Sequence, residues 1–172
     1  MKQNIKYILL SLLVLLMVSC QKSQEYYEGL YVVGADQLSP VANLTIDDLP
    51  AVIGIKVASS CAIGDHVEVG MKATPELVES FNKEYKKNYE LLPEKSYKLE
   101  NTTLTIENGK NTSTDGVRLS VISRDLLKEG KTYLLPISIV SVSDKNLSVI
   151  EGSRTIYLSL IHISEPTRPI SI

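Results

Sequence analysis

One short stretch of the sequence carries residue types that could bind a metal ion. Asp65, His66 and Glu68 lie within four positions, and carboxylate and imidazole groups are common metal ligands. Strand alternation would place His66 and Glu68 on the face opposite Val67, and no second cluster of such ligands accompanies them. A solvent-exposed strand face is the better interpretation. We therefore expect neither a metal nor another cofactor.

The acidic residues do not form a recognisable catalytic pair. Glycoside hydrolysis needs two carboxylates that face each other across the scissile bond. Asp47 and Asp48 are adjacent and precede Pro50, which is typical of residues that cap a turn. The sequence also lacks a nucleophile elbow and a phosphate-binding loop. We expect no catalytic residue in this chain.

Aromatic side chains are the remaining candidates for contact with a ligand. The sequence has nine tyrosines, one phenylalanine and no tryptophan. An exposed ring offers an apolar face on which a sugar can stack, and a tyrosine adds a polar group. Tyr89 and Tyr97 flank a loop around Pro93 and are the candidate exposed pair. The alternative is that both rings pack this loop onto the domain.

Residues 1–19 are typical of a lipoprotein signal peptide. Residues 7–18 carry no charge, which suits a signal-peptide apolar region but is too short for a spanning helix of about 20 residues. The segment ends in Leu16-Met17-Val18-Ser19-Cys20, which resembles a bacterial lipobox, although leucine is usual where Met17 stands. The alternative is an ordinary secretory signal that ends near a cysteine.

Lipidation of Cys20 would attach the chain to a membrane without a spanning helix, since two or more acyl chains give a firm anchor. We therefore expect an outer-membrane lipoprotein of the cell envelope, exposed at the cell surface, with residues 20–28 as a tether. The charges after Cys20 do not decide between the periplasmic and the outer face.

The C-terminal residues 158–172 have a different expected origin. Residues 158–168 match the in-frame translation of a transposase-type sequencing adapter at eleven consecutive positions. We expect the genuine reading frame to have been cut near Tyr157, so that a longer protein is truncated there. The alternative is a real terminal strand with a polar tail.

Composition narrows the remaining function classes. The 172 residues carry a formal net charge of −2, and 44% of them are hydrophobic. Such a chain lacks the basic footprint of a nucleic-acid-binding protein, so no nucleic acid is expected as a partner. With Cys20 lipidated, Cys61 has no disulfide partner and is expected to be a small buried apolar residue. Residues 29–157 suit one domain.

Alternating apolar residues predict about seven short strands and hence a β-sandwich. These segments are residues 30–33, 53–57, 67–71, 103–106, 117–121, 135–139 and 155–157. Asn108-Gly109 predicts a hairpin between two of them.

One helix is predicted near residues 75–88. Thr74 is the expected N-cap, Pro75 suits the first helical position and Asn88 is the expected left-handed stop. Leu77, Phe81 and Tyr85 recur every four residues with Val78 beside them, which predicts a narrow apolar stripe packed on the edge or end of a sheet. Pro93 prevents the helix from continuing.

Residues 27–157 resemble a known family. The resemblance begins at Thr74–Val78, Phe81–Tyr85 and Tyr89–Tyr97, and continues through Thr103–Ile106, Asn108–Lys110, Leu126 and Gly130–Val142. This pattern resembles domain-of-unknown-function family seventeen thirty-five, the N-terminal module of many surface lipoproteins of glycan-foraging Bacteroidetes-type bacteria.

The resemblance implies an immunoglobulin-like β-sandwich placed directly after the lipid anchor. It implies no catalytic residue in this module, and often a following lectin-like, discoidin-like or glycosidase module, such as a family-eighteen endoglycosidase. We therefore expect a non-catalytic module that spaces or presents a partner domain in glycan binding or utilisation. The alternatives are the front of a truncated glycoside hydrolase, or a module that itself binds a glycan or an envelope protein.

Overall fold

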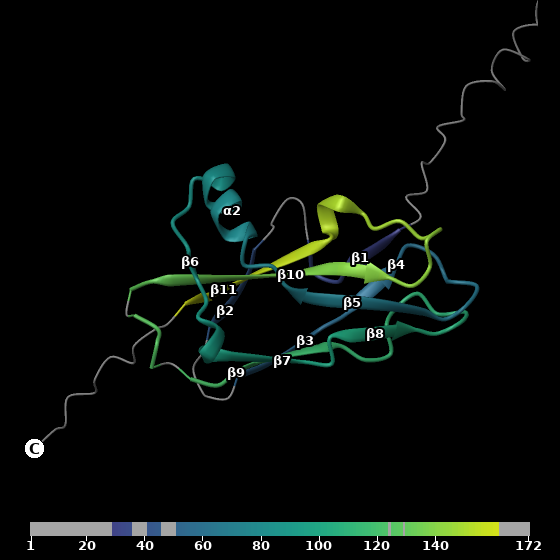
Figure 1. Ribbon diagram of the computed structural model, residues 1–172, viewed down its shortest axis with the longest axis horizontal. Helices are drawn as coiled ribbons and strands as arrows, with labels where there is room; N and C mark the ends of the chain where they lie inside the picture. Colours follow the sequence, from purple (N-terminus) through teal and green to yellow (C-terminus); the bar gives the residue numbers. More distant parts are fainter. Residues whose placement is uncertain (1–28, 36–40, 46–50, 124, 129, 162–172) are drawn as a thin grey trace, which may run out of the picture.

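The computed structural model describes residues 29–35, 41–45, 51–123, 125–128 and 130–161. These residues form two packed β-layers, with one α-helix on the outside of one layer (Figure 1). The predicted mainly β fold, a sandwich with one inserted helix, is confirmed.

The larger layer is a mixed sheet in which β10 occupies a central position. Its order is β2 (Val41–Thr45), β11 (Thr155–Ile161), β10 (Thr132–Val142), β5 (Val67–Ala73) and β8 (Thr103–Ile106), with β6 (Glu90–Leu91) parallel to the start of β10. The β10, β11, β5 and β8 pairings are antiparallel, whereas β2 runs parallel to β11.

The opposite layer is a three-stranded antiparallel sheet that continues into a two-stranded one. β9 (Val117–Val121) lies between β3 (Ala51–Ile55) and β7 (Tyr97–Glu100), and β4 (Val57–Ser59) pairs with β1 (Leu30–Val32). β3 and β4 are separated by Lys56, where the chain leaves β9 and begins to pair with β1. The single strand predicted over residues 53–57 is therefore two strands.

The described residues form eleven strands, compared with about seven predicted. The division at Lys56 adds one strand, and β2, β6 and β7 add three that the apolar alternation did not indicate. These three strands are two to five residues long, and a segment so short carries little periodic signal.

The main core lies between the two layers. The inward faces of β5, β8 and β9 alternate as predicted, with Val67, Val69, Met71, Leu104, Ile106, Val117, Leu119 and Val121 buried. Leu135, Ile137 and Ile139 of β10 and Leu158 and Leu160 of β11 complete this core from the larger layer.

β10 is buried on both faces, because helix α2 (Leu77–Tyr85) lies across its outer side (Figure 1). Val78, Phe81 and Leu134 form a second apolar cluster there. Pro136 and Ser138 alternate with the apolar residues of the strand predicted over 135–139 and would face outward by that pattern, but both are buried. The helix therefore covers the face of a central strand, and its predicted position at a sheet edge or end was wrong.

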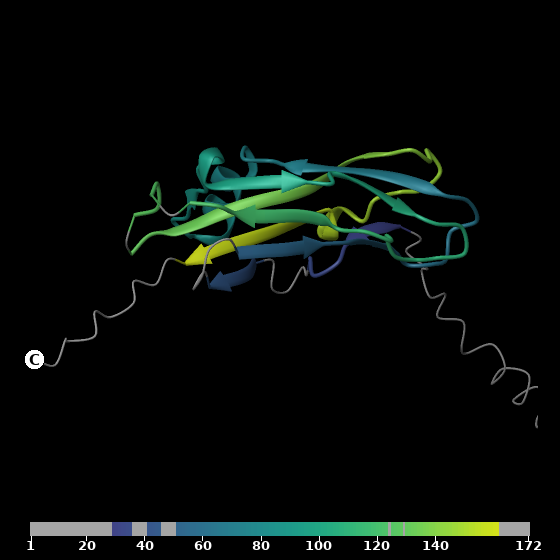
Figure 2. The same cartoon turned by 90° about the horizontal axis from the view of Figure 1, so that it is seen from below.

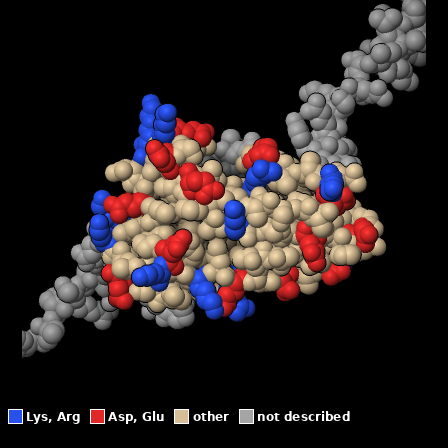
Figure 3. Space-filling model, in the orientation of Figure 1, with Lys and Arg blue, Asp and Glu red and all other residues tan. Residues whose placement is uncertain are grey.

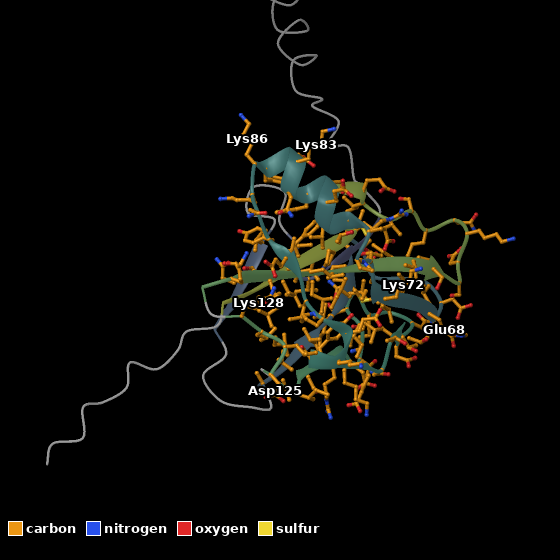
Figure 4. The ribbon with its side chains drawn as sticks, turned by 60° about the vertical axis from the view of Figure 1, so that its left-hand side comes forward. Glu68, Lys72, Lys83, Lys86, Asp125 and Lys128 are labelled. Atoms are coloured by element: carbon orange, nitrogen blue, oxygen red, sulfur yellow. The ribbon has the colours of Figure 1, made fainter. Side chains whose placement is uncertain are left out.

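The predicted helix is confirmed, but its two ends differ from the prediction. Its entry is a turn in which Leu77 N–H donates to Thr74 O at 3.0 Å, and no side chain caps it. Thr74 is not a side-chain cap, because its hydroxyl pairs with Ser138 instead. The left-handed stop is Lys86 (φ 51°, ψ 45°), not Asn88. Lys83 and Lys86 project away from the sandwich (Figure 4).

The Asn108-Gly109 turn is present, but the hairpin predicted there was wrong. Lys110 N–H donates to Glu107 O at 3.0 Å, and Gly109 takes a positive φ of 73°. The strand before the turn, β8, pairs with β5, whereas the chain after it crosses to the other layer, where Thr112 bridges to Ala58. A turn motif specifies local geometry and not the partner of the strand that follows.

The last strand continues beyond the domain boundary expected at Tyr157. β11 runs to Ile161, and Leu158 and Leu160 are each 1% exposed. The adapter origin of residues 158–172 concerns how these residues were encoded and stays a prediction. Within the described part of the chain, no helix is long and apolar enough to cross a membrane.

Candidate functional site

The two tyrosines predicted as a ligand-contacting pair lie in different parts of the packing. Tyr89 is half-buried against the second apolar cluster, with its ring centroid 6.1 Å from that of Phe81. Tyr97 begins β7 and is half-buried against the main core. Burial, and secondarily the carboxylate of Glu94, raise the pKa of the Tyr97 phenol. The structure does not join them in one site, and their contact with a ligand stays a prediction.

Tyr89 is held in place through its backbone. The Asn82 side chain accepts a hydrogen bond from Tyr89 N–H at 2.9 Å and donates one to Tyr89 O at 2.8 Å. These two bonds close the loop between α2 and β6, so Tyr89 has a defined packing role whether or not it contacts a ligand.

Phe81 is the centre of an aromatic cluster. Tyr85 stacks on Phe81 with ring centroids 4.5 Å apart. The ring centroid of Tyr157, on β11, lies 4.4 Å from that of Phe81. Burial, then the charge of Glu84, raise the pKa of the Tyr157 phenol. Phe81 is 2% exposed and Tyr85 40% exposed, so the predicted stripe packs at Phe81 and opens to solvent at Tyr85.

The residues considered as metal ligands lie at the surface. The side chains of His66 and Asp65 are 65% and 90% exposed, with Nδ1 and Oδ1 3.4 Å apart. Glu68 is also exposed, and its position on β5 is visible in Figure 4. Among the described residues, no three His, Cys, Asp or Glu side chains gather closely enough to hold a metal.

Cys61 is a free thiol that is half-buried rather than fully buried as predicted. It lies in the loop between β4 and β5, beside a small hollow that Asp65 and Asp144 also line. Three other residues considered above, Cys20, Asp47 and Asp48, lie outside the described residues.

A groove on the outer face of the β3–β9–β7 sheet is the feature that the sequence did not indicate. Its first half is an open hollow of about 510 Å³, lined by Val33, Val52, Gly54, Lys56, Gly116 and Arg118. This sheet faces the viewer in Figure 2. Its floor is the backbone of β3 and β9, where the two antiparallel strands place Gly54 directly opposite Arg118.

The second half of the groove is a neighbouring hollow of about 420 Å³. It shares Gly116 and Arg118 with the first half and adds Glu100, Asn101 and Asp115. Asn101 has a positive φ of 55° and donates its side-chain amide to Gly116 O at 3.2 Å. We call the two hollows together the outer groove. One half carries two cationic side chains and the other carries two carboxylates and an amide.

No ion pair among the described residues joins the charges of the outer groove. Lys98 holds Glu100 at 2.6 Å from outside the groove, and this hydrogen bond lowers the pKa of the Glu100 carboxyl, with a smaller contribution from the charge of Arg118. The ion pairs found among the described residues include neither Lys56 nor Arg118. Charges of both signs are likewise interspersed over the face shown in Figure 3.

This arrangement suits binding better than glycoside hydrolysis. A general acid in such an enzyme needs a raised pKa in order to hold its proton near neutral pH. The pKa of the Glu100 carboxyl is shifted in the opposite direction, chiefly by the hydrogen bond from Lys98, which suits a hydrogen-bond acceptor. The groove offers charged donors at one end and charged acceptors at the other.

The sequence contained part of the signal for this groove. Val52, Gly54 and Lys56 alternate with the predicted core positions of their strand. Arg118 lies between the predicted core positions Val117 and Leu119. Outward orientation could therefore be predicted for all four residues. What the alternation could not supply was the register that puts Gly54 opposite Arg118. A lone glycine in a strand was therefore the available clue, since it often marks close approach of another group.

The comparisons with known proteins give the class of this domain. The chain belongs to a family of N-terminal domains, whose model, described as "-like, N-terminal domain", matches residues 26–146. No curated protein matches the sequence significantly.

Three solved structures from Bacteroides species are similar to this chain. A Bacteroides ovatus protein described as a candidate carbohydrate-binding protein is 26% identical with a TM-score of 0.62, covering 79% of this chain and 37% of its own. A two-domain Bacteroides fragilis protein of unknown function is 16% identical with a TM-score of 0.63, covering 81% of this chain and 47% of its own.

The third is Bacteroides thetaiotamicron EndoBT-3987 with a Man5GlcNAc product, 15% identical with a TM-score of 0.62. The match covers 77% of this chain and 31% of that protein. In each of the three structures, the chain spans less than half of the length, so the matched region is one part of a larger protein.

Proposed function

We propose that this chain is a non-catalytic module of the cell envelope that spaces or presents a partner domain in glycan binding or utilisation. The observation that carries the proposal is the match to a family of N-terminal domains over residues 26–146. Such a domain precedes something else, and the similar structures are two to three times as long as the matched region. We further propose that this family is domain-of-unknown-function family seventeen thirty-five.

The glycan part of the proposal is supported by one relative. The Bacteroides ovatus protein at 26% identity is described in terms of carbohydrate binding. Incubating the purified chain with a panel of glycans tests the non-catalytic assignment. Release of any shorter glycan by the chain alone would contradict it.

Attachment to the membrane through Cys20 is the second part of the proposal, with the outer membrane as the site and surface exposure as the orientation. The lipobox-like residues 16–20 support it. Cys20→Ala should leave an uncleaved or soluble precursor, whereas Cys61→Ala, which removes the other thiol, should fractionate with the membrane like the parent chain. Unchanged fractionation of Cys20→Ala would contradict anchoring.

Direct binding of a glycan by this domain is a second candidate function, and the outer groove favours it. A glycan array on the purified chain, repeated with Tyr89→Ala and Tyr97→Ala, shows whether the two tyrosines contribute. Loss of binding in either variant, with the fold retained, would support the tyrosine site. Binding that survives in both would remove these tyrosines from the proposal.

The parent protein could instead be a glycoside hydrolase of which this chain is the front. The match of this chain to one part of EndoBT-3987 supports this alternative. Sequencing the locus beyond the codon for Tyr157 decides it. A glycosidase domain in frame would support the alternative, and a stop codon there would contradict it.

A further inference from the structure

The first half of the outer groove exists because one position in β3 lacks a side chain. Gly54 lies between Val52 and Lys56 on the outward face and is paired directly with Arg118 of β9. A Cβ atom built on Gly54 would meet nothing within 4 Å, so no neighbouring side chain fills the space above it. The hollow is a gap in the side-chain layer of the sheet, open to solvent.

Two cationic groups line this gap without a carboxylate bound to either. Lys56 Nζ makes one long contact, 3.4 Å to the carbonyl oxygen of Thr114. Arg118 lies opposite Glu100 on its other side and attracts its charge, but it makes no hydrogen bond or ion pair with Glu100, whose carboxylate is held by Lys98 at 2.6 Å. Arg118 therefore retains guanidinium donors for a ligand. A planar guanidinium binds carboxylate or sulfate oxygens through two parallel N–H bonds.

The floor of the groove is fixed by tight backbone packing. A Cβ at Gly116 would lie 3.0 Å from Ile55 O, so a side chain there would require the β3 backbone to shift by a few tenths of an ångström. The exposed side chains of Val33 and Val52, 44% and 56% exposed, form an apolar rim beside the cations. Such a rim suits the C–H face of a sugar ring better than it suits a small inorganic ion.

The second half of the groove limits the charge that a ligand can carry. Glu100 and Asp115 would repel a polyanion with closely spaced charges, but they can accept hydrogen bonds from sugar hydroxyl groups. Asn101 adds an amide beside them. A matching ligand carries one negative group at the Lys56–Arg118 end and neutral hydroxyl groups at the other.

We propose that the outer groove binds an anionic glycan, with Lys56 and Arg118 holding the carboxylate or sulfate of an acidic sugar and Glu100 and Asp115 accepting hydroxyl groups of its neighbour. This deepens the proposed glycan function and rests on it. The carboxylate and the sulfate present the same chemistry to the two cations, so the test below separates them by source.

The test compares matched pairs of charged and neutral glycans on the full chain in detergent by titration calorimetry. The pairs are sialyllactose with lactose and 6-sulfo-N-acetyllactosamine with N-acetyllactosamine. We expect at least one charged member to bind about tenfold or more tightly than its neutral partner, since bonds to charged groups are the stronger ones. Which pair shows the difference identifies the carboxylate or the sulfate.

Three variants locate the binding. Arg118→Gln keeps a polar side chain but removes the charge, and should reduce affinity for the charged glycan about tenfold or more. Gly54→Val fills the gap while both cations remain, and the open space at Gly54 makes it compatible with the fold. Lys72→Gln is the matched control, because Lys72 is an exposed strand cation on the other sheet that does not line the groove, and it should change affinity by less than about twofold.

Each result bears on the inference. Loss of binding in Arg118→Gln and Gly54→Val, with retention in Lys72→Gln, supports it. Equal affinity within every glycan pair, or charged-glycan binding that both groove variants retain, overturns it. The outcome is distinct from failure of the proposed envelope function, which is read independently by the fractionation of Cys20→Ala.

Discussion

The hydroxyl oxygens of Thr74 and Ser138 lie 2.7 Å apart and are both buried. Ser138 also contacts the hydroxyl of Thr155 at 2.8 Å, so three hydroxyl groups from the α2 entry, β10 and β11 form one chain of hydrogen bonds. Thr74 N–H adds a bond to Pro136 O at 3.0 Å. The entry of the helix is thereby attached to the middle of the larger sheet rather than capped by its own side chain.

Ser138→Ala should destabilise the domain by about 1–3 kcal/mol, because it leaves the buried Thr74 hydroxyl without a partner in this chain of bonds. Urea unfolding of the two proteins measures the difference. Ser80→Ala is the matched control, since its exposed hydroxyl bonds only to Leu77 O within the helix, and it should change stability by less than about 0.5 kcal/mol. Equal effects of the two substitutions would contradict the role assigned to Ser138.

Asn82→Asp should destabilise the domain about as much as Asn82→Ala, by about 1–3 kcal/mol. Aspartate has nearly the same shape as asparagine, but it lacks the amide donor and places a carboxylate against the carbonyl oxygen of Tyr89. Asn88→Ala, the residue expected to end the helix, should have little effect. Thermal unfolding measures the order of these three effects. A mild effect of Asn82→Asp would show that only the bond from Tyr89 N–H matters.

Sequence periodicity predicted the strands whose two faces have different surroundings. Val67, Val69 and Met71 alternate cleanly because one face of β5 meets the core and the other meets solvent. β10 breaks the same rule because α2 covers its outer face, so Ser138 is buried where a polar residue predicted exposure. That covering is a contact between distant segments, and local alternation carries no information about it.

The candidate site was less predictable than the fold for the same reason. Tyr89 and Tyr97 are close in sequence, but the intervening β6 and a 3₁₀ turn at Glu94–Ser96 carry the chain from one layer to the other. The outer groove arises from the opposite situation, since Gly54 and Arg118 are far apart in sequence and meet only through strand register. Residue type could be read in advance, whereas proximity could not.

The Glu90–Lys131 ion pair predicts a defined pH dependence of stability. Lys131 Nζ lies 2.7 Å from Glu90 Oε1, and this hydrogen bond is the main cause that lowers the pKa of Glu90 and raises the pKa of Lys131. A lowered carboxyl pKa stabilises the fold at pH values above the unfolded-state pKa. This stabilisation is lost as the pH falls through the folded-state pKa. A raised ammonium pKa stabilises the fold at pH values below the unfolded-state pKa. This stabilisation is lost as the pH rises through the folded-state pKa.

The pair should therefore contribute fully between about pH 5 and pH 10 and weaken on both sides. Glu90→Gln should be less stable than the parent near pH 7, with the difference shrinking as the pH falls below the ordinary carboxyl value of 4.5 and Glu90 protonates. Urea midpoints across this range measure it. Glu79→Gln, an exposed helix residue outside the ion pairs found among the described residues, should show no such pH-dependent difference. A constant gap for Glu90→Gln would contradict the assignment.

Ser159→Ala should change the stability of the domain in the opposite direction to Ser138→Ala. Ser159 is 1% exposed, and its hydroxyl has no hydrogen-bond partner in the structure. It lies opposite Leu134 on the helix-covered face of the larger sheet, where an unpaired hydroxyl carries a desolvation cost. Removing that hydroxyl should leave stability unchanged or raise it by about 1 kcal/mol.

The comparison of these two buried serines on adjacent strands is a sharp test, because both substitutions remove one oxygen atom. Ser159 also belongs to the segment that the sequence predicts to be adapter-encoded, for which no selection for this core is expected. Urea unfolding under identical conditions should show Ser138→Ala to be less stable than the parent, and Ser159→Ala to be as stable as the parent or more stable. A loss of more than about 1 kcal/mol in Ser159→Ala would mean that its hydroxyl is satisfied, and that this strand is fitted to the fold as closely as its neighbours.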